Sequence, residues 1–289
     1  QKPEYRYDFH KQNWFENNQI EHQAVREEVG LFEQSSFSKF LIQGKDATSV
    51  LNNVATSNMD VELGKVVYTQ FLNKNGGVEA DLTITRLEED QYFLVTAAFT
   101  ATHVKAWITE NIRDGVYCIV TYISGAYSML NIQGPNSRRL LSNISSADFS
   151  TDKFPFGTMQ EIEIGYQTAL AVRISYTGEL GWELYIPVEM TIPVYNELIG
   201  AGKSLGLHHC GYHTLNSLRV EKAYREWAHD MGPTDTLNEC GLSFTCDWNK
   251  ATGFIGKDAL LDQSNLLTRR LTQFILDDPE PLLAHNEPI

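Results

Sequence analysis

The sequence predicts an α+β fold in which antiparallel sheets with flanking helices form two similar halves. Two pairs of segments repeat at one spacing between Phe40 and Ile199, and short polar turns join the strand-like stretches. Because 42% of the 289 residues are hydrophobic, the chain can bury one large core or several smaller ones.

The repeat places the main elements. Residues 40–54 and 130–144 each read as a strand, a glycine turn and a helix, and Ile132 follows Ile42 by 90 residues. Residues 92–95 and 182–186 read as strands before helical patterns and are again 90 residues apart. Asp46 and Asn136 are the expected N-caps of the repeated helices. Two matches at one offset favour a duplication, whereas the alternative is chance similarity of a common strand–turn–helix pattern.

The remaining elements follow from alternation and turn residues. The pattern predicts strands over residues 66–72, 82–87, 92–96, 169–176, 181–186 and 271–276, and helices over 214–227 and 257–263. In the longer helix, Leu215, Leu218, Ala223 and Trp227 lie near one face. The expected divisions are 1–125 and 126–205 for the two halves, 206–268 for a helical third lobe, and 269–289 for the start of a further domain.

Charge and motifs exclude several classes of function. The net charge of −14 repels phosphate backbones, so nucleic acid is not an expected partner. No apolar run reaches the ~18 residues of a membrane span. Cys118, Cys210, Cys240 and Cys246 form no CxxC pair and read as small apolar residues in a reducing compartment. We expect no metal site, because neighbouring ligands such as His208 and His209 point to opposite faces of a strand. Nucleotide-binding glycine motifs are also missing from the sequence.

Two carboxylates are the best candidates for chemistry. Asp81 follows a glycine turn and begins a strand, where aspartate is unfavourable. It either caps the turn through the backbone or points into a cleft, where it could accept a proton or stabilise a cation. Glu183 alternates with Trp182 and Leu184 and shares a face with Tyr185. That face is either solvated or suited to a flat heterocycle, whose amidine edge a carboxylate can bind through two parallel hydrogen bonds.

Several motifs together resemble the glycine-cleavage T-protein (aminomethyltransferase) superfamily. They are GGVEADLT at 76–83, SYTGELGWEL at 175–184, LRVEK at 218–222 and GFIGKDAL at 253–260. FPF at 154–156, EKAYREW at 221–227 and GLSFTC at 241–246 are similar to the C-terminal half of sarcosine and dimethylglycine dehydrogenases. The resemblance runs from about Phe15 to the end of the chain.

The resemblance implies a three-domain cloverleaf around a central folate site, with Asp81 as the catalytic residue. It implies that tetrahydrofolate contacts Tyr68, Tyr176, Glu183, Leu41 and Phe37, the last standing where a methionine is usual. Two departures concern the family's pair of acids, here Ala80 and Asp81, and an arginine that anchors the folate tail, here Leu215. The C-terminal barrel is expected to be truncated, and FAD is expected only in a missing N-terminal domain, because the chain lacks an initiator methionine and begins abruptly.

By this resemblance, the domain accepts a one-carbon unit from the iminium of an N-methyl amine and forms 5,10-methylenetetrahydrofolate. Two alternatives remain open: a non-catalytic subunit like the regulatory subunit of pyruvate dehydrogenase phosphatase, and a free-standing folate-dependent methyltransferase or demethylase. The expected partners are small molecules only. The expected compartment is the mitochondrial matrix in a eukaryote and the cytoplasm in a bacterium.

Overall fold

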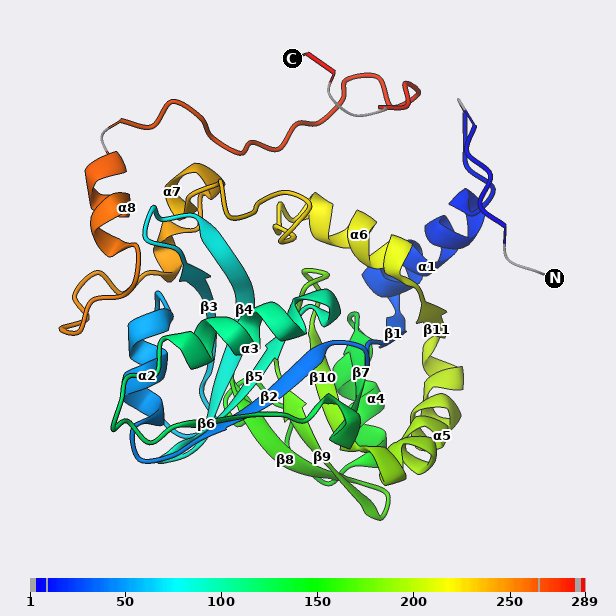
Figure 1. Ribbon diagram of the computed structural model, residues 1–289. Helices are drawn as coiled ribbons and strands as arrows, with labels where there is room; N and C mark the ends of the chain where they lie inside the picture. Colours follow the sequence, from blue (N-terminus) through cyan, green and yellow to red (C-terminus); the bar gives the residue numbers. More distant parts are fainter. Residues whose placement is uncertain (1–3, 9, 265, 284–286, 289) are drawn as a thin grey trace.

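Two open, mostly antiparallel sheets form the body of the protein (Figure 1). The computed structural model describes residues 4–8, 10–264, 266–283 and 287–288. One sheet has the order β3-β4-β5-β2-β6 and the other β11-β1-β7-β10-β9-β8. The strands of the first are β2 (Ser38–Gln43), β3 (Val66–Leu72), β4 (Val78–Glu88), β5 (Gln91–Thr96) and β6 (Ile119–Tyr122). Those of the second are β1 (Val29–Glu33), β7 (Tyr127–Gln133), β8 (Met159–Ile164), β9 (Gln167–Val172), β10 (Gly181–Pro187) and β11 (Leu207–Cys210).

The predicted duplication is confirmed by strand pairing. Ile42 of β2 lies opposite Tyr92 of β5, and Ile132 of β7 lies opposite Trp182 of β10. Both partners are displaced by the same 90 residues. The orders β3-β4-β5-β2 and β8-β9-β10-β7 also correspond strand for strand. Chance similarity of local patterns would not reproduce the long-range order, so the two halves share one topology.

Each half turns from strand to helix at an equivalent glycine. Gly44 has φ +133° and Gly134 has φ +131°, a region that only glycine adopts at little cost. A Cβ on Gly134 would also lie 2.6 Å from the carbonyl oxygen of Glu28. Asp46 and Asn136 occupy the predicted N-cap positions, but neither side chain makes the predicted capping hydrogen bond. Asp46 instead accepts a hydrogen bond from the backbone of Tyr117, and the Asn136 amide donates to the Leu205 carbonyl, so both side chains fix neighbouring loops.

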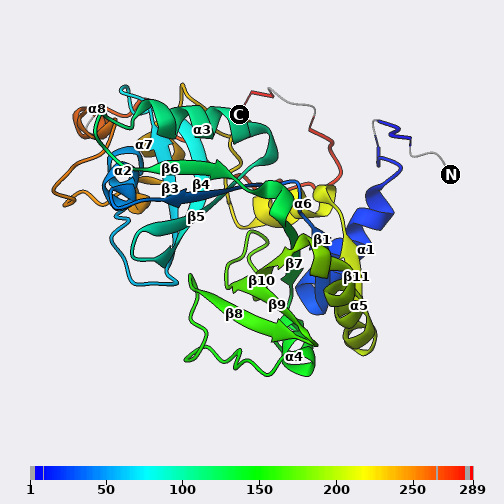
Figure 2. The ribbon, with the colours of Figure 1, turned by 60° about the horizontal axis from the view of Figure 1, so that its bottom comes forward.

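Helices cover the outer face of each sheet. The helices α2 (Ala47–Val54) and α3 (Ala101–Glu110) pack on the five-stranded sheet, and α4 (Ser137–Ile144) and α5 (Thr191–Gly202) pack on the six-stranded sheet. The inner faces meet each other, as Figure 2 shows from below. Phe93 of β5 and Tyr185 of β10 make the closest ring contact across this junction, with centroids 5.1 Å apart. Residues at alternate strand positions are therefore directed toward the space between the two halves.

A third group of elements lies at one end of both sheets. It contains α1 (Phe15–Glu27), α6 (Tyr212–Glu221), α7 (Leu237–Cys240) and α8 (Lys257–Gln263), and α1 and α6 lie side by side (Figure 1). Helix α8 matches the prediction, but a helix reaching Trp227 is wrong. Ala223 has φ +55°, which ends α6, so Ala223 and Trp227 do not share its face. Leu215 and Leu218 are buried as expected.

The last described segment crosses this third group as an extended chain (Figure 1). The predicted strand at 271–276 is wrong, because no described strand pairs with it. Leu271 donates a backbone hydrogen bond to Glu239, and Phe274 and Ile275 are exposed. The proposed domain boundaries remain a prediction. Strand β1, which lies in the proposed first half, pairs with β7 and β11 of the six-stranded sheet.

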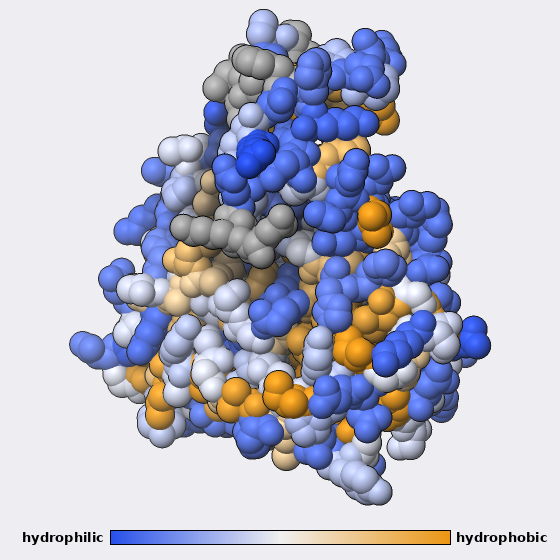
Figure 3. Space-filling model, turned by 90° about the vertical axis from the view of Figure 1, so that its right-hand side faces the viewer, coloured by the Kyte–Doolittle hydropathy of each residue, from blue (hydrophilic) through white to orange (hydrophobic). Residues whose placement is uncertain are grey.

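One side of the molecule is largely hydrophilic, with apolar residues gathered toward its lower part (Figure 3). Across the described residues, no helix combines the length and apolar character that crossing a membrane requires.

Candidate functional site

Asp81 lies on the inner face of the five-stranded sheet. The outer-facing neighbours Ala80 and Leu82 belong to the core, so the carboxylate points the other way, beside Gln70 of β3. The Gln70 amide donates to Asp81 Oδ1 at 2.9 Å, and the Tyr68 hydroxyl makes a further hydrogen bond to this carboxylate. Burial raises the pKa of Asp81 to about 6, although both hydrogen bonds act to lower it. A group with this pKa can gain and lose a proton near neutral pH.

The glycine turn before Asp81 is held by another residue. The Asn73 side-chain oxygen accepts hydrogen bonds from the backbone of Asn75 and Gly77, each at 3.0 Å. Asp81 itself lies inside β4 rather than at the turn. Turn capping therefore does not explain Asp81, and the cleft-facing interpretation remains.

Tyr176 joins Asp81 and Tyr68 from the loop after β9. Its hydroxyl donates to the Arg225 carbonyl at 2.8 Å, and its ring stacks on Tyr224 with centroids 6.1 Å apart. Burial raises the pKa of Tyr176 far above its ordinary value, and the negative charge of Asp81 adds to this effect. Burial also raises the pKa of Tyr68, and Asp81 and, to a smaller extent, Tyr176 add to this effect. These three predicted site residues thus lie in one neighbourhood.

Glu183 lies on the inner face of the other sheet. Trp182 and Leu184 enter the outer core, which confirms the predicted alternation. The Tyr185 hydroxyl donates to Glu183 Oε2 at 2.6 Å. Burial raises the pKa of Glu183 to about 7, against the opposing effects of Tyr185 and of the positive charge of Lys39. Glu183 is half-buried, so its carboxylate is less solvated than one on an exposed strand face.

Lys39 and Phe37 approach Glu183 from the five-stranded half. Lys39 is fully buried, its ammonium donates to the carbonyls of Ser35 and Phe37, and burial lowers its pKa to about 8. Phe37 packs on the apolar cluster that contains Tyr185. Leu41 shares the face of Lys39, since Phe40 and Ile42 enter the opposite core. No described contact joins Leu41 to Asp81.

A chain of buried side chains connects the two carboxylate regions. The Thr177 hydroxyl donates to Gln133, whose amide donates to Asn131 at 2.6 Å. Asn131 lies opposite Glu183 in the β7–β10 pairing, and Thr177 follows Tyr176 in sequence. The loop that carries Tyr176 is therefore positioned by the same strand pair that carries Glu183.

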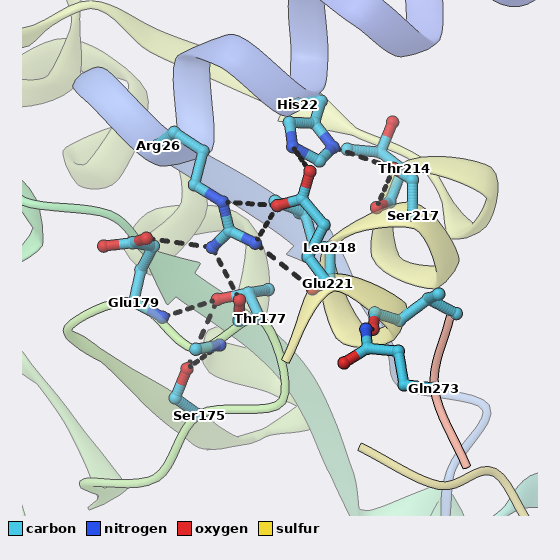
Figure 4. A network of polar contacts seen from close by, with 12 residues as sticks. His22, Arg26, Ser175, Thr177, Glu179, Thr214, Ser217, Leu218, Glu221 and Gln273 are labelled. Carbon is cyan, nitrogen blue, oxygen red and sulfur yellow. Dashed lines mark hydrogen bonds and ion pairs between the residues drawn. The ribbon is translucent and has the colours of Figure 1, made fainter. Parts of the chain in front are cut away.

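Arg26 of α1 links the loop that carries Tyr176 to α6 (Figure 4). Its guanidinium donates to the Thr177 carbonyl at 2.7 Å and to Glu179 at 2.9 Å on the loop. It also donates to Glu221 at 2.8 Å and to the Leu218 carbonyl at 3.1 Å on α6. One planar cation thus binds acceptors on two segments that are distant from each other and from α1 in sequence.

We expect Arg26→Met to lower the free energy of unfolding by about 1–3 kcal/mol, because it leaves partly buried acceptors without their charged donor. Amide hydrogen exchange of residues 175–179 should also accelerate. Chemical denaturation and hydrogen exchange measure the two effects, with the exposed Arg139→Met on α4 as the control. Equal stability of the two variants would contradict the proposal that Arg26 stabilises the protein by linking the loop to α6.

A separate groove of about 520 Å³ lies between α1 and α6. Its lining includes His22, Arg26 and Ser217 but none of the six predicted site residues. The His208-His209-Cys210 motif also lies apart: His209 contacts the Tyr195 hydroxyl at 2.8 Å, and Cys210 packs beside Phe32. Neither feature brings chemistry to the region between the sheets.

Sequence reasoning missed four residues of the region: Lys39, Gln70, Asn131 and Gln133. All are polar residues buried on inner strand faces. A polar residue in a strand is usually exposed, so composition alone gave no reason to select them. The strand register offered the one available signal, because it places Gln70 opposite Asp81 and Asn131 opposite Glu183.

A family model described as the GCVT N-terminal domain matches residues 2–250. 4-Methylaminobutanoate oxidase (formaldehyde-forming) of Paenarthrobacter nicotinovorans is 42% identical, over 99% of this chain and 35% of that protein. Mitochondrial sarcosine dehydrogenase of Homo sapiens is 36% identical, over 90% of this chain and 30% of that protein. The chain spans about a third of the length of these relatives.

The fold agrees with the sequence comparison. The crystal structure of the glycine cleavage system aminomethyltransferase T from Bartonella henselae superimposes with a TM-score of 0.77 at 24% identity. The match covers 91% of this chain and 71% of that one. Because the family model covers most of the chain, including both carboxylate regions, the chain belongs to the GCVT (aminomethyltransferase) family.

Proposed function

We propose that the chain binds tetrahydrofolate between its two halves and transfers to it the one-carbon unit of an oxidised N-methyl amine. The observation that carries the proposal is the placement of two half-buried carboxylates, Asp81 and Glu183, on the inner faces of the two sheets, which face each other. Half-buried carboxylates without a lysine or arginine salt bridge still cost stability, so their presence indicates use by a ligand.

The chemistry of the region fits a pterin. A pterin is flat and carries adjacent N–H donors, which a carboxylate accepts through charge-assisted hydrogen bonds. Glu183 supplies that carboxylate, and the rings of Tyr68 and Tyr176 supply aromatic surface. Leu41 and Phe37 are assigned to the apolar wall of the proposed pterin site. Binding here would make folate the centre of the proposed cloverleaf.

Tetrahydrofolate supplies the nucleophilic nitrogens that accept the methylene carbon, with 5,10-methylenetetrahydrofolate and the free amine as products. Asp81 accepts the proton released at nitrogen, or stabilises the cationic carbon, and Glu183 fixes the orientation of the pterin. The relatives named after 4-methylaminobutanoate and sarcosine point to N-methylated amino acids as the amine class. The iminium comes from oxidation of the amine, the class of reaction for which these relatives are named.

Titration with tetrahydrofolate, followed by quenching of the fluorescence of the five tryptophans, tests the proposal. We expect saturable quenching by tetrahydrofolate and at least tenfold weaker binding of p-aminobenzoylglutamate, which lacks the pterin. A folded chain that binds neither compound would favour the non-catalytic alternative. Equal binding of both compounds would contradict recognition of the pterin by Glu183.

A further inference from the structure

Gln70 is a fully buried amide with a defined partner at each end. Its nitrogen donates to Asp81 at 2.9 Å, and its oxygen accepts from the Thr245 hydroxyl at 2.5 Å. Gln70 and Asp81 are cross-strand neighbours on β3 and β4, whereas Thr245 lies 175 residues away in the short helix η5 (Ser243–Thr245). The third group of elements thus contacts the carboxylate through this amide.

Thr245 is itself held from two sides. Its carbonyl accepts a hydrogen bond from the Ser57 hydroxyl at 2.5 Å, and its own hydroxyl lies 2.8 Å from the Leu242 carbonyl. A carbonyl cannot donate, so the Thr245 proton points either to Gln70 or to Leu242. When it points to Gln70, it fixes the amide oxygen on that side and leaves the amide nitrogen for Asp81.

The same partners also suit a protonated Asp81. A carboxylic acid donates, so it would bond to the amide oxygen of a reversed Gln70. The amide nitrogen would then donate to Thr245, and Thr245 to the Leu242 carbonyl. Each of these polar groups keeps a partner in both arrangements, which matters because an unsatisfied buried group costs about 1–3 kcal/mol.

We propose that Gln70 and Thr245 are positioning residues that form a reversible hydrogen-bond relay, through which Asp81 gains and loses its proton without losing its partners. This inference rests on the proposed function for the use of that proton, but the relay itself requires no folate. Among the residues that the structure describes, the other titratable groups facing Asp81 are the hydroxyls of Tyr68 on β3 and Tyr176 from the loop after β9. Both stay neutral near pH 7, because burial raises their pKa values.

The relay is tested without ligand by measuring the titration of Asp81. The carboxyl stretch in infrared difference spectra, identified by its loss in Asp81→Asn, reports the protonated form. Gln70→Met removes a hydrogen bond from both forms of Asp81, and the bond to the ionised form is the stronger one, so we expect the midpoint to rise by about one pH unit. An unchanged midpoint in a folded Gln70→Met chain would overturn the proposal.

Thr245 provides a matched pair that leaves Gln70 in place. Thr245→Ser keeps the hydroxyl and should titrate like the unaltered chain, whereas the nearly isosteric Thr245→Val should raise the midpoint by about one unit. A merely structural role would lower stability in Thr245→Val without moving the midpoint, and that result would refute the relay.

A third measurement is made on the unaltered chain, with Asp81→Asn as its control. The side-chain amide resonances of Gln70 should shift with the same midpoint as the Asp81 carboxyl, and should stop shifting in Asp81→Asn. Resonances that are insensitive to pH would overturn the coupling. Failure of the proposed function is seen differently, as normal one-carbon transfer by Asp81→Asn while the unaltered chain still shows the coupled titration of Asp81 and Gln70.

Discussion

Asp81→Asn is expected to lower one-carbon transfer to tetrahydrofolate by about 10²–10⁴-fold, the usual worth of a positioned acid–base group. Asparagine keeps the shape of the side chain and can still accept from the Gln70 amide, but it cannot take up a proton. Folate binding should change by less than about threefold, since the pterin is assigned to Glu183. The loss is therefore predicted in the rate of transfer rather than in affinity.

The measurement supplies an N-methyl amine, a flavin dehydrogenase that oxidises it, tetrahydrofolate and an excess of a formaldehyde trap. The fraction of carbon recovered as 5,10-methylenetetrahydrofolate reports transfer within the protein, because free formaldehyde is removed. Asp90→Asn, at the exposed turn after β4, is the matched control. If Asp81→Asn and Asp90→Asn transferred equally, Asp81 would have no catalytic role.

The parts of the fold that sequence predicted depend on local pattern. Alternation identified β3 from Val66 to Leu72 and placed Glu183 with Tyr185 on one face. The 90-residue offset predicted duplicated halves, and the like pairing of β2 with β5 and of β7 with β10 agrees with it. Such features need only neighbouring residues to specify them.

The failures involve contacts between distant residues. Residues 214–227 contain no glycine or proline to end a helix, yet α6 stops at Glu221. There, the buried Arg219 turns the chain back by binding Asp230, Glu226 and the Tyr224 carbonyl. The segment 271–276 has a strand pattern but no described neighbour, and a strand forms only where its backbone finds a partner. Thr245 could not be linked to Gln70, because no pattern connects residues 175 positions apart.

Glu183→Gln is expected to weaken tetrahydrofolate binding and to stabilise the protein above pH 7. Replacing a carboxylate that accepts two N–H bonds by a neutral amide removes charge assistance, worth about 1.5–3 kcal/mol, so we expect the Kd to rise roughly 10- to 100-fold. Fluorescence titration of the variant measures this. Glu163→Gln, at an exposed position of β8 in the same sheet, is the control and should bind like the unaltered chain.

The effect on stability follows from proton linkage. Burial raises the pKa of Glu183 from 4.5 to about 7, so the folded chain binds this proton more tightly than the unfolded chain does. The stabilising contribution is complete below pH 4.5 and is lost as the pH rises through 7. Glutamine does not ionise, so the advantage of Glu183→Gln over the unaltered chain should grow by about 1–3 kcal/mol between pH 4 and pH 8, after allowance for residual solvent screening.

Urea denaturation at the two pH values measures this difference, again with Glu163→Gln as the control. A variant that gains stability while losing folate affinity would place Glu183 among groups kept for binding at the expense of folding. If the advantage of Glu183→Gln were the same at both pH values, the carboxylate would be as well solvated as that of Glu163. The proposal that Glu183 is a desolvated carboxylate that binds a pterin would then fail, whatever the affinity of the variant for folate.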